Sequence, residues 1–183
     1  MRRLSSALVA ELALPVPAPP RELYRALCDA TGRRRGRPVV FRTAVFPPGT
    51  ASGLWLGLAD RDLVVVEERT APDHQLVILG HELWHLHAEH RGHDVQGVAV
   101  AARLLDEAAG TDADAERAAV RAAVRRVAAR ARFDRAEERD AETFGLLLAS
   151  KCRTRLTGSA LRAPVRRHDV AGRIEASLGR PGR

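Results

Sequence analysis

The sequence has few cysteines and no long apolar run, and each of these shortages excludes a class of protein. Cys28 and Cys152 are the only two cysteines among 183 residues, too few for a disulfide framework or a metal site built from cysteine thiolates. This scarcity is typical of a reducing compartment, so we expect a cytoplasmic protein. The longest apolar runs, at 63–66 and 76–80, are far shorter than the ~20 residues that a membrane-spanning helix needs. We therefore expect no membrane contact and no signal peptide.

Lysine is almost missing as well, because Lys151 is the single lysine among 30 basic residues. Residues 151–183 contain nine basic and two acidic residues and so carry the whole net charge of +7. The charge distribution predicts a neutral domain over 1–150 followed by a basic C-terminal tail over 151–183. Such a tail can contact nucleic acid, but it lacks interleaved aromatic residues and no groove-reading helix is recognisable, so we rank this function well behind the others.

The order of the hydrophobic patterns predicts an α+β fold. Alternating or continuous apolar residues predict three strands, at 39–46, 54–59 and 63–67, and we expect them to form a small antiparallel sheet packed by helices. The third pattern indicates the most buried strand, and the arginine run at 33–37 is expected to be a solvated loop. Helical spacing of apolar residues covers 3–14, 20–32, 73–89 and 135–150, and a helical insertion is expected at about 93–133.

An HExxH motif, His81-Glu82-Leu83-Trp84-His85, lies inside the helix expected at 73–89. Residues four apart lie ~40° apart around a helix axis, so His81 and His85 can both reach one Zn²⁺. Glu82 then lies beside the ion, where it can take a proton from a water molecule that the ion acidifies. Four leucines occupy the other face of the helix, which predicts that the motif faces a cleft. The alternative is a helix with incidental histidines, since others follow at His87, His90 and His93.

A third zinc ligand must come from another element, because two histidines do not complete a zinc site. The helix expected at 135–150 offers Glu138 and, one turn later, Glu142. Only one of them can match the height of the histidine pair, and helix geometry leaves the choice open. An acidic start of a surface helix is the alternative. The carboxylates share a face with small residues, which permit a close approach to the HExxH helix, whereas Phe144 and Leu146 are expected to pack on other sides; the small residues are Ala141, Gly145 and Ala149.

Residues 20–150 resemble the ImmA/IrrE family of zinc-dependent peptidases in two motifs, the HExxH sequence and the segment Glu138-x-x-Ala141-x-x-Phe144. The resemblance implies a zincin-like fold with the HExxH sequence on its active-site helix, zinc ligands His81, His85 and Glu138, and Glu82 as the catalytic base. It also implies a zinc metalloendopeptidase whose partner is a separate protein, a helix-turn-helix repressor or antitoxin. The chain is similar, too, to actinobacterial proteins described as toxin components of toxin-antitoxin systems.

The sequence departs from the family pattern in ways that favour a second hypothesis. Trp84 stands where the family has glycine and is expected to narrow the cleft, and 52 residues separate His85 from Glu138. Both departures favour a non-catalytic zinc-binding partner module or toxin component. Glu142 replaces an asparagine, and we expect it to accept a hydrogen bond from a ligand imidazole. No residue is singled out as the oxyanion donor; the candidates are His74, His87 and His90.

Overall fold

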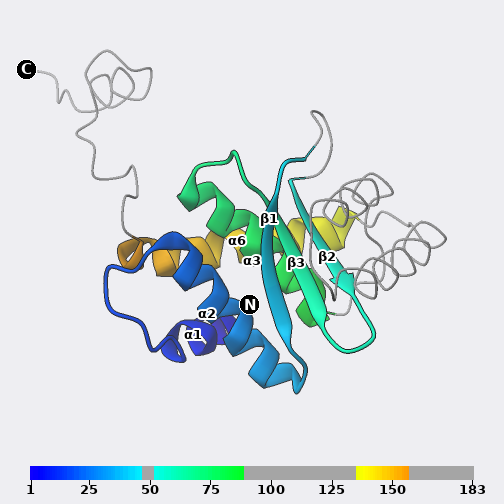
Figure 1. Cartoon of the computed structure of the whole chain (residues 1–183), viewed down its shortest axis with the longest axis horizontal. Coiled ribbons are helices and arrows are strands. Elements are labelled where there is room, and N and C mark those ends of the chain that lie inside the picture. Colours follow the sequence, from blue (N-terminus) through cyan, green and yellow to red (C-terminus); the bar gives the residue numbers. More distant parts are fainter. Residues whose placement is uncertain (47–51, 89–134, 157–183) are drawn as a thin grey trace, which may run out of the picture.

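A computed structural model describes residues 1–46, 52–88 and 135–156 of the chain (Figure 1). These residues form a mixed α+β unit in which a three-stranded sheet is packed by helices. The insertion predicted at 93–133 and most of the predicted tail lie outside the described residues. In chain order the elements are α1 (Arg2–Ala10), α2 (Pro20–Arg35), β1 (Val39–Ala44), β2 (Gly53–Gly57), β3 (Asp62–Glu67), α3 (Pro72–Ala88), α6 (Arg135–Cys152) and the 3₁₀ helix η1 (Arg153–Arg155).

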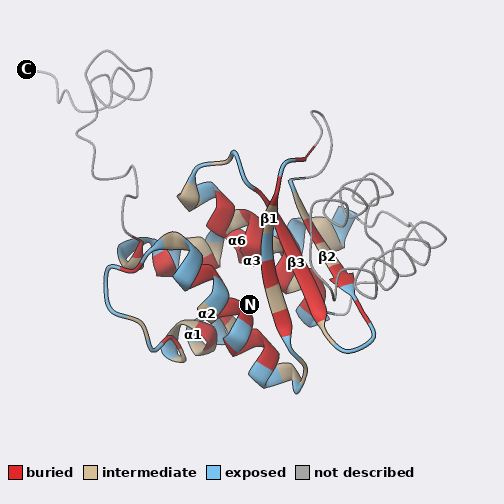
Figure 2. Cartoon of the chain, in the orientation of Figure 1, coloured by how far each residue is buried: buried red, intermediate tan, exposed pale blue. Residues whose placement is uncertain are grey.

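The sheet has the strand order β1-β3-β2, and the prediction of an antiparallel sheet is wrong for one of its two strand pairs. β2 pairs with β3 antiparallel, with Leu54 opposite Val65, but β1 pairs with β3 parallel, with Phe41 opposite Val64. Successive strands reverse direction, so an all-antiparallel sheet would need β2 in the middle. β3 takes the middle instead, a position that suits its continuous apolar run at 63–66, and all six of its residues are buried there (Figure 2).

The two faces of the sheet belong to different apolar clusters. Val64 and Val66 of β3 point into the main core, which the helices α1, α2, α3 and α6 complete. Leu63 and Val65, which alternate with them, belong to a smaller cluster on the other face, formed with residues of β1 and β2 and their flanks. The alternation is the period of two expected of a strand, and it places the helices of the main core on one side of the sheet.

The arginine run at 33–37 is not the loop that the sequence predicts, although Arg33 and Arg34 are exposed as expected. Helix α2 continues to Arg35 and ends at Gly36, whose φ of 67° is the left-handed conformation that favours glycine. The Nε atoms of Arg35 and Arg37 lie 3.6 and 3.4 Å from Oδ2 of the buried Asp62, and Arg35 also donates to the carbonyl oxygen of Leu86 at 2.7 Å. The run therefore ties the end of α2 to the sheet and to the end of α3.

The packed structure continues past residue 150, where the sequence predicts the tail to begin. Cys152 and Leu156 are buried, and the backbone amide of Ala18 donates to the carbonyl oxygen of Arg155 at 2.6 Å. Residues 151–156 are therefore part of the folded unit. Among the described residues, no helix is long and apolar enough to cross a membrane.

Candidate metal centre

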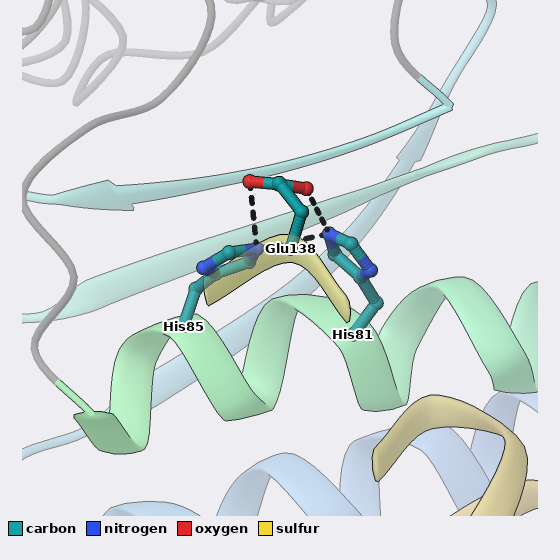
Figure 3. Close-up of side chains that lie close together, drawn as sticks. All are labelled: His81, His85 and Glu138. Atoms are coloured by element: carbon teal, nitrogen blue, oxygen red, sulfur yellow. Dashed lines mark hydrogen bonds and ion pairs between the residues drawn. The ribbon is translucent and has the colours of Figure 1, made fainter. Parts of the chain in front are cut away.

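Helix α3 carries the HExxH motif on the face away from the main core. Pro72 and Asp73 in its first turn favour helix initiation, because proline needs no amide partner there and a carboxylate interacts well with the helix dipole. Leu79, Leu83 and other leucines of the opposite face are buried in the core, as the sequence predicts. Packing on that side fixes the rotation of α3, and the two motif histidines consequently point toward α6 (Figure 3).

Helix α6 comes unusually close to α3. A Cβ atom built on Gly145 would lie 2.5 Å from the carbonyl oxygen of Val77 and 3.2 Å from the backbone nitrogen of His81. Only a glycine at this position allows the backbones of the two helices to touch without displacement. The contact lies two turns from Glu138 on α6, so it sets how far the Glu138 carboxylate stands from the motif.

The three side chains predicted as ligands come together. His81 Nε2 and His85 Nε2 are 2.9 Å apart, and the two oxygens of Glu138 lie 3.4 Å from His81 Nε2 and 3.5 Å from His85 Nε2 (Figure 3). The donor atoms of the group all lie within 4.8 Å of one another. His85 is buried, while His81 and Glu138 are partly exposed. The structure therefore brings His81 and His85 of α3 together with Glu138 of α6, which lies 53 positions after His85 in the sequence.

This group can hold a metal ion. Two imidazole nitrogens and a carboxylate are a borderline donor set of the kind that binds zinc and other first-row metals. Burial lowers the pKa of His81, partly opposed by the charge of Glu142, so the neutral imidazole that binds metals is favoured. The donor chemistry and the convergence of the donor atoms both fit an ion, although they do not by themselves identify which one.

Glu82 lies against the outer edge of β2 rather than in the metal group. In the pairing of β2 with β3, the backbone polar groups of Ser52 and Leu54 face β3. The backbone amide of Trp55, between them and the end of the strand, therefore points away from β3. This amide donates a hydrogen bond to the Glu82 carboxylate. The other carboxylate oxygen, Oε2, is buried and has no hydrogen-bond partner among the described residues. Burial, and then the charge of Glu138, raise the pKa of Glu82 to about 8, against the opposing effect of the Trp55 hydrogen bond.

A cleft of about 450 Å³ lies beside the metal group, between α3, α6 and the start of β2. Trp84 is not among the described residues that line it, so the expected narrowing is not seen. Its ring packs instead on Phe144 at a centroid distance of 5.0 Å and on His87 at 5.7 Å. The described residues that line the cleft are Ser52, Gly53, His74, Val77, Ile78, His81, Glu82, Glu142 and Leu146.

The structure distinguishes the two carboxylates of α6. Glu138 belongs to the metal group, whereas Glu142 lies one turn away and is not part of it. Within the described chain, Glu142 makes no hydrogen bond with either ligand imidazole, contrary to the expectation that it accepts one. Its carboxylate lines the cleft instead.

One feature of the site has no counterpart in the sequence predictions. The contact of Glu82 with the Trp55 amide depends on strand register, which no local pattern indicates. The expectation that Leu146 packs on another side of the helix, as Phe144 does, is wrong, because Leu146 is 62% exposed and lines the cleft. Its position four residues after Glu142, on the same helix face, is the sequence signal for this. Of the candidate oxyanion donors, His74 lines the cleft, His87 lines a different pocket and His90 lies outside the described residues.

Comparisons of the chain with protein-family models, with curated proteins and with solved structures gave no match. The resemblance to the ImmA/IrrE peptidases therefore remains a prediction from the two motifs.

Proposed function

We propose that the protein is a cytoplasmic zinc-dependent metallopeptidase that cleaves a partner protein, a helix-turn-helix repressor or antitoxin. One observation supports this most: His81, His85 and Glu138 converge at a cleft, and the buried Glu82 places an unpartnered carboxylate oxygen beside them. The repressor or antitoxin partner is inferred from the family resemblance alone.

His81, His85 and Glu138 would hold Zn²⁺ as a three-residue site, leaving room in its coordination shell for a substrate. Zinc, when bound, polarises a peptide carbonyl and lowers the pKa of a water molecule. Two histidines and one glutamate are among the ligand sets of zinc hydrolases, which favours zinc over the other metals that the donors can accept.

Glu82 is proposed as the general base, a role that requires its ionised form; the positive charge of a bound zinc ion would favour that form against the burial that raises its pKa. Its Oε1 atom lies beside Gly53 of β2, whereas its Oε2 atom has no hydrogen-bond partner in the described part of the chain. Oε2 accepts a proton from the attacking water as the new C–O bond forms. The same oxygen then passes the proton to the amine nitrogen of the leaving peptide when the C–N bond breaks. The hydrogen bond from the Trp55 amide fixes the carboxylate so that no reorientation is needed between the two transfers.

A substrate in extended conformation is proposed to lie along β2. The backbone of Gly53 faces outward in the register, and Gly53 lines the cleft together with Glu82. A strand that pairs there passes directly by the base and the metal group. His74 lies two helical turns, ~10 Å, from His81, so it reaches a more distant part of the substrate than the scissile carbonyl.

The test is to incubate zinc-loaded wild type and Glu82→Gln with helix-turn-helix proteins encoded beside its gene and to identify fragments by mass spectrometry. We expect wild type to cleave one of them, and Glu82→Gln to keep its zinc without cleaving. His81→Ala is the matched control that should lose both zinc and cleavage. If wild type and Glu82→Gln had the same effect on a bound partner and neither cut it, the non-catalytic module or toxin component would replace the peptidase. The packing of Trp84 on Phe144 removes one of the two arguments for that alternative.

A further inference from the structure

The cleft has a wall that the proposed chemistry does not use. Glu142 and Leu146, one turn apart on α6, face Val77 and Ile78 of α3 across it. Leu146 is 62% exposed and so offers an aliphatic surface to the cleft. Glu142 is exposed and, within the described chain, forms neither a hydrogen bond nor an ion pair. A carboxylate and an aliphatic surface therefore lie next to each other, immediately beside the metal group.

The charge of this wall is negative although the protein as a whole is basic. Among the described residues that line the cleft there is no arginine or lysine, despite 30 basic residues in the chain. Glu142 is close enough to His81 for its charge to act on that imidazole. An occupant that places a positive charge near Glu142 and hydrocarbon on Leu146 would satisfy both parts of the wall.

Arginine and lysine side chains have this combination, since an aliphatic stem leads to a cationic head. We propose that Glu142, Leu146 and Val77 form a subsite for an arginine or lysine side chain of the substrate, close in sequence to the cleaved bond. The inference rests on the proposed peptidase function and adds a substrate class to it. Glu142 acts here by binding substrate, and neither the metal nor the base depends on it.

The experiment uses N-acetylated, C-amidated peptide libraries, so that side chains carry the only cations. Zinc-loaded wild type is expected to cleave preferentially at bonds within two residues of arginine or lysine. For a peptide that is cut, replacing that residue by norleucine should lower kcat/KM about 2- to 5-fold, as is typical of a partly exposed ion pair. Glu142→Gln should bring the arginine-to-norleucine ratio close to one, and Glu142→Arg should favour glutamate at the same position. Asp140→Asn, an exposed acid on the same helix that does not line the cleft, is the control that should keep the wild-type ratio.

Binding separates failure of the subsite from failure of the peptidase. Zinc-loaded Glu82→Gln should bind a fluorescent arginine peptide more tightly than its norleucine analogue, and the added Glu142→Gln change should remove the difference. Cleavage without a cationic preference, or a preference that survives Glu142→Gln, would overturn the subsite and leave the peptidase standing. If no peptide is cleaved, the peptidase proposal fails, and equal binding of the two peptides would overturn the subsite as well. Zinc content and melting temperature of each variant establish that it is folded.

Discussion

Gly80 of α3 and Gly145 of α6 are in backbone contact. A Cβ atom built on Gly80 would lie only 2.8 Å from the Cα atom of Gly145. His81 follows Gly80 directly, and Glu138 lies two turns before Gly145 on its helix. The spacing between the histidine pair and the third carboxylate therefore depends on a contact between two residues that have no side chains. The metal group and the packing of the two helices are thus linked.

Gly145→Ala is expected to weaken both packing and metal binding. The new methyl group would lie 2.5 Å from the Val77 carbonyl oxygen, a backbone atom that cannot move aside, so the helices must separate. Overpacking of this kind costs roughly 1–3 kcal/mol of unfolding free energy. Urea denaturation and chelator competition measure the two effects. Gly57→Ala is the control, since its Cβ would meet Asp62 at an ordinary 3.5 Å; equal losses in both variants would contradict the helix-contact explanation.

Glu138→Ala should lower zinc affinity by far more than Glu142→Ala. Glu138 lies within 3.4–3.5 Å of both imidazole nitrogens, whereas Glu142 acts on His81 only through its charge. Loss of a hydrogen-bonded outer partner costs ~10- to 100-fold in metal affinity; Glu142 makes no such bond within the described residues, so its removal should cost less, and removal of the direct ligand Glu138 should cost more. Titration against a zinc chelator compares the two variants directly. The reverse order would transfer the role of ligand to Glu142.

Gly53→Ala should separate metal binding from catalysis. A Cβ atom at this position would lie 2.6 Å from Oε1 of Glu82 and equally close to Cγ2 of the buried Ile78, so both side chains must shift. Because side chains move rather than backbone, the protein should stay folded and bind zinc, with a melting temperature somewhat below that of wild type. Displacement of the base by ~1 Å is expected to reduce kcat about 100-fold. Cleavage at the wild-type rate by a zinc-loaded Gly53→Ala protein would show that the position of Glu82 is unimportant.

Acid stability should depend on Glu67, the last residue of β3. Hydrogen bonds from the Arg69 side chain, with further ones from the backbone of Arg69 and Phe46, lower the pKa of Glu67 to about 2. A carboxyl whose pKa is depressed by folding stabilises the protein above its unfolded pKa of about 4.5, and that contribution is lost as the pH falls toward 2. Wild type should therefore exceed Glu67→Gln in stability above pH 5.

Urea denaturation at a series of pH values tests the role of Glu67. Between pH 7 and pH 2, the difference in unfolding free energy between wild type and Glu67→Gln should shrink as the pH falls from about 4.5 toward 2. Glu68→Gln is the control, because this neighbouring side chain is exposed and its removal should leave the pH dependence unchanged. A constant difference between wild type and Glu67→Gln at all pH values would mean that folding does not lower the pKa of Glu67.

The sequence by itself determined the helices and the histidine pair. Leucines at helical spacing place α3, and positions four apart bring His81 next to His85 whatever surrounds the helix. The third ligand was predictable only as one of two carboxylates one turn apart. Strand positions were visible as well, because alternation and turn residues are local signals.

Tertiary structure decided everything that depends on how the elements meet. The strand order places β3 between β1 and β2, where all its residues are buried, and this order makes one pair parallel. The choice of Glu138 over Glu142 followed from the height at which Gly145 meets α3, and the place of Glu82 from the outward amide of Trp55. The physical reason is the same in each case: spacing along a chain specifies which residues share a face, whereas the distance and register between two faces depend on the packing of both partners.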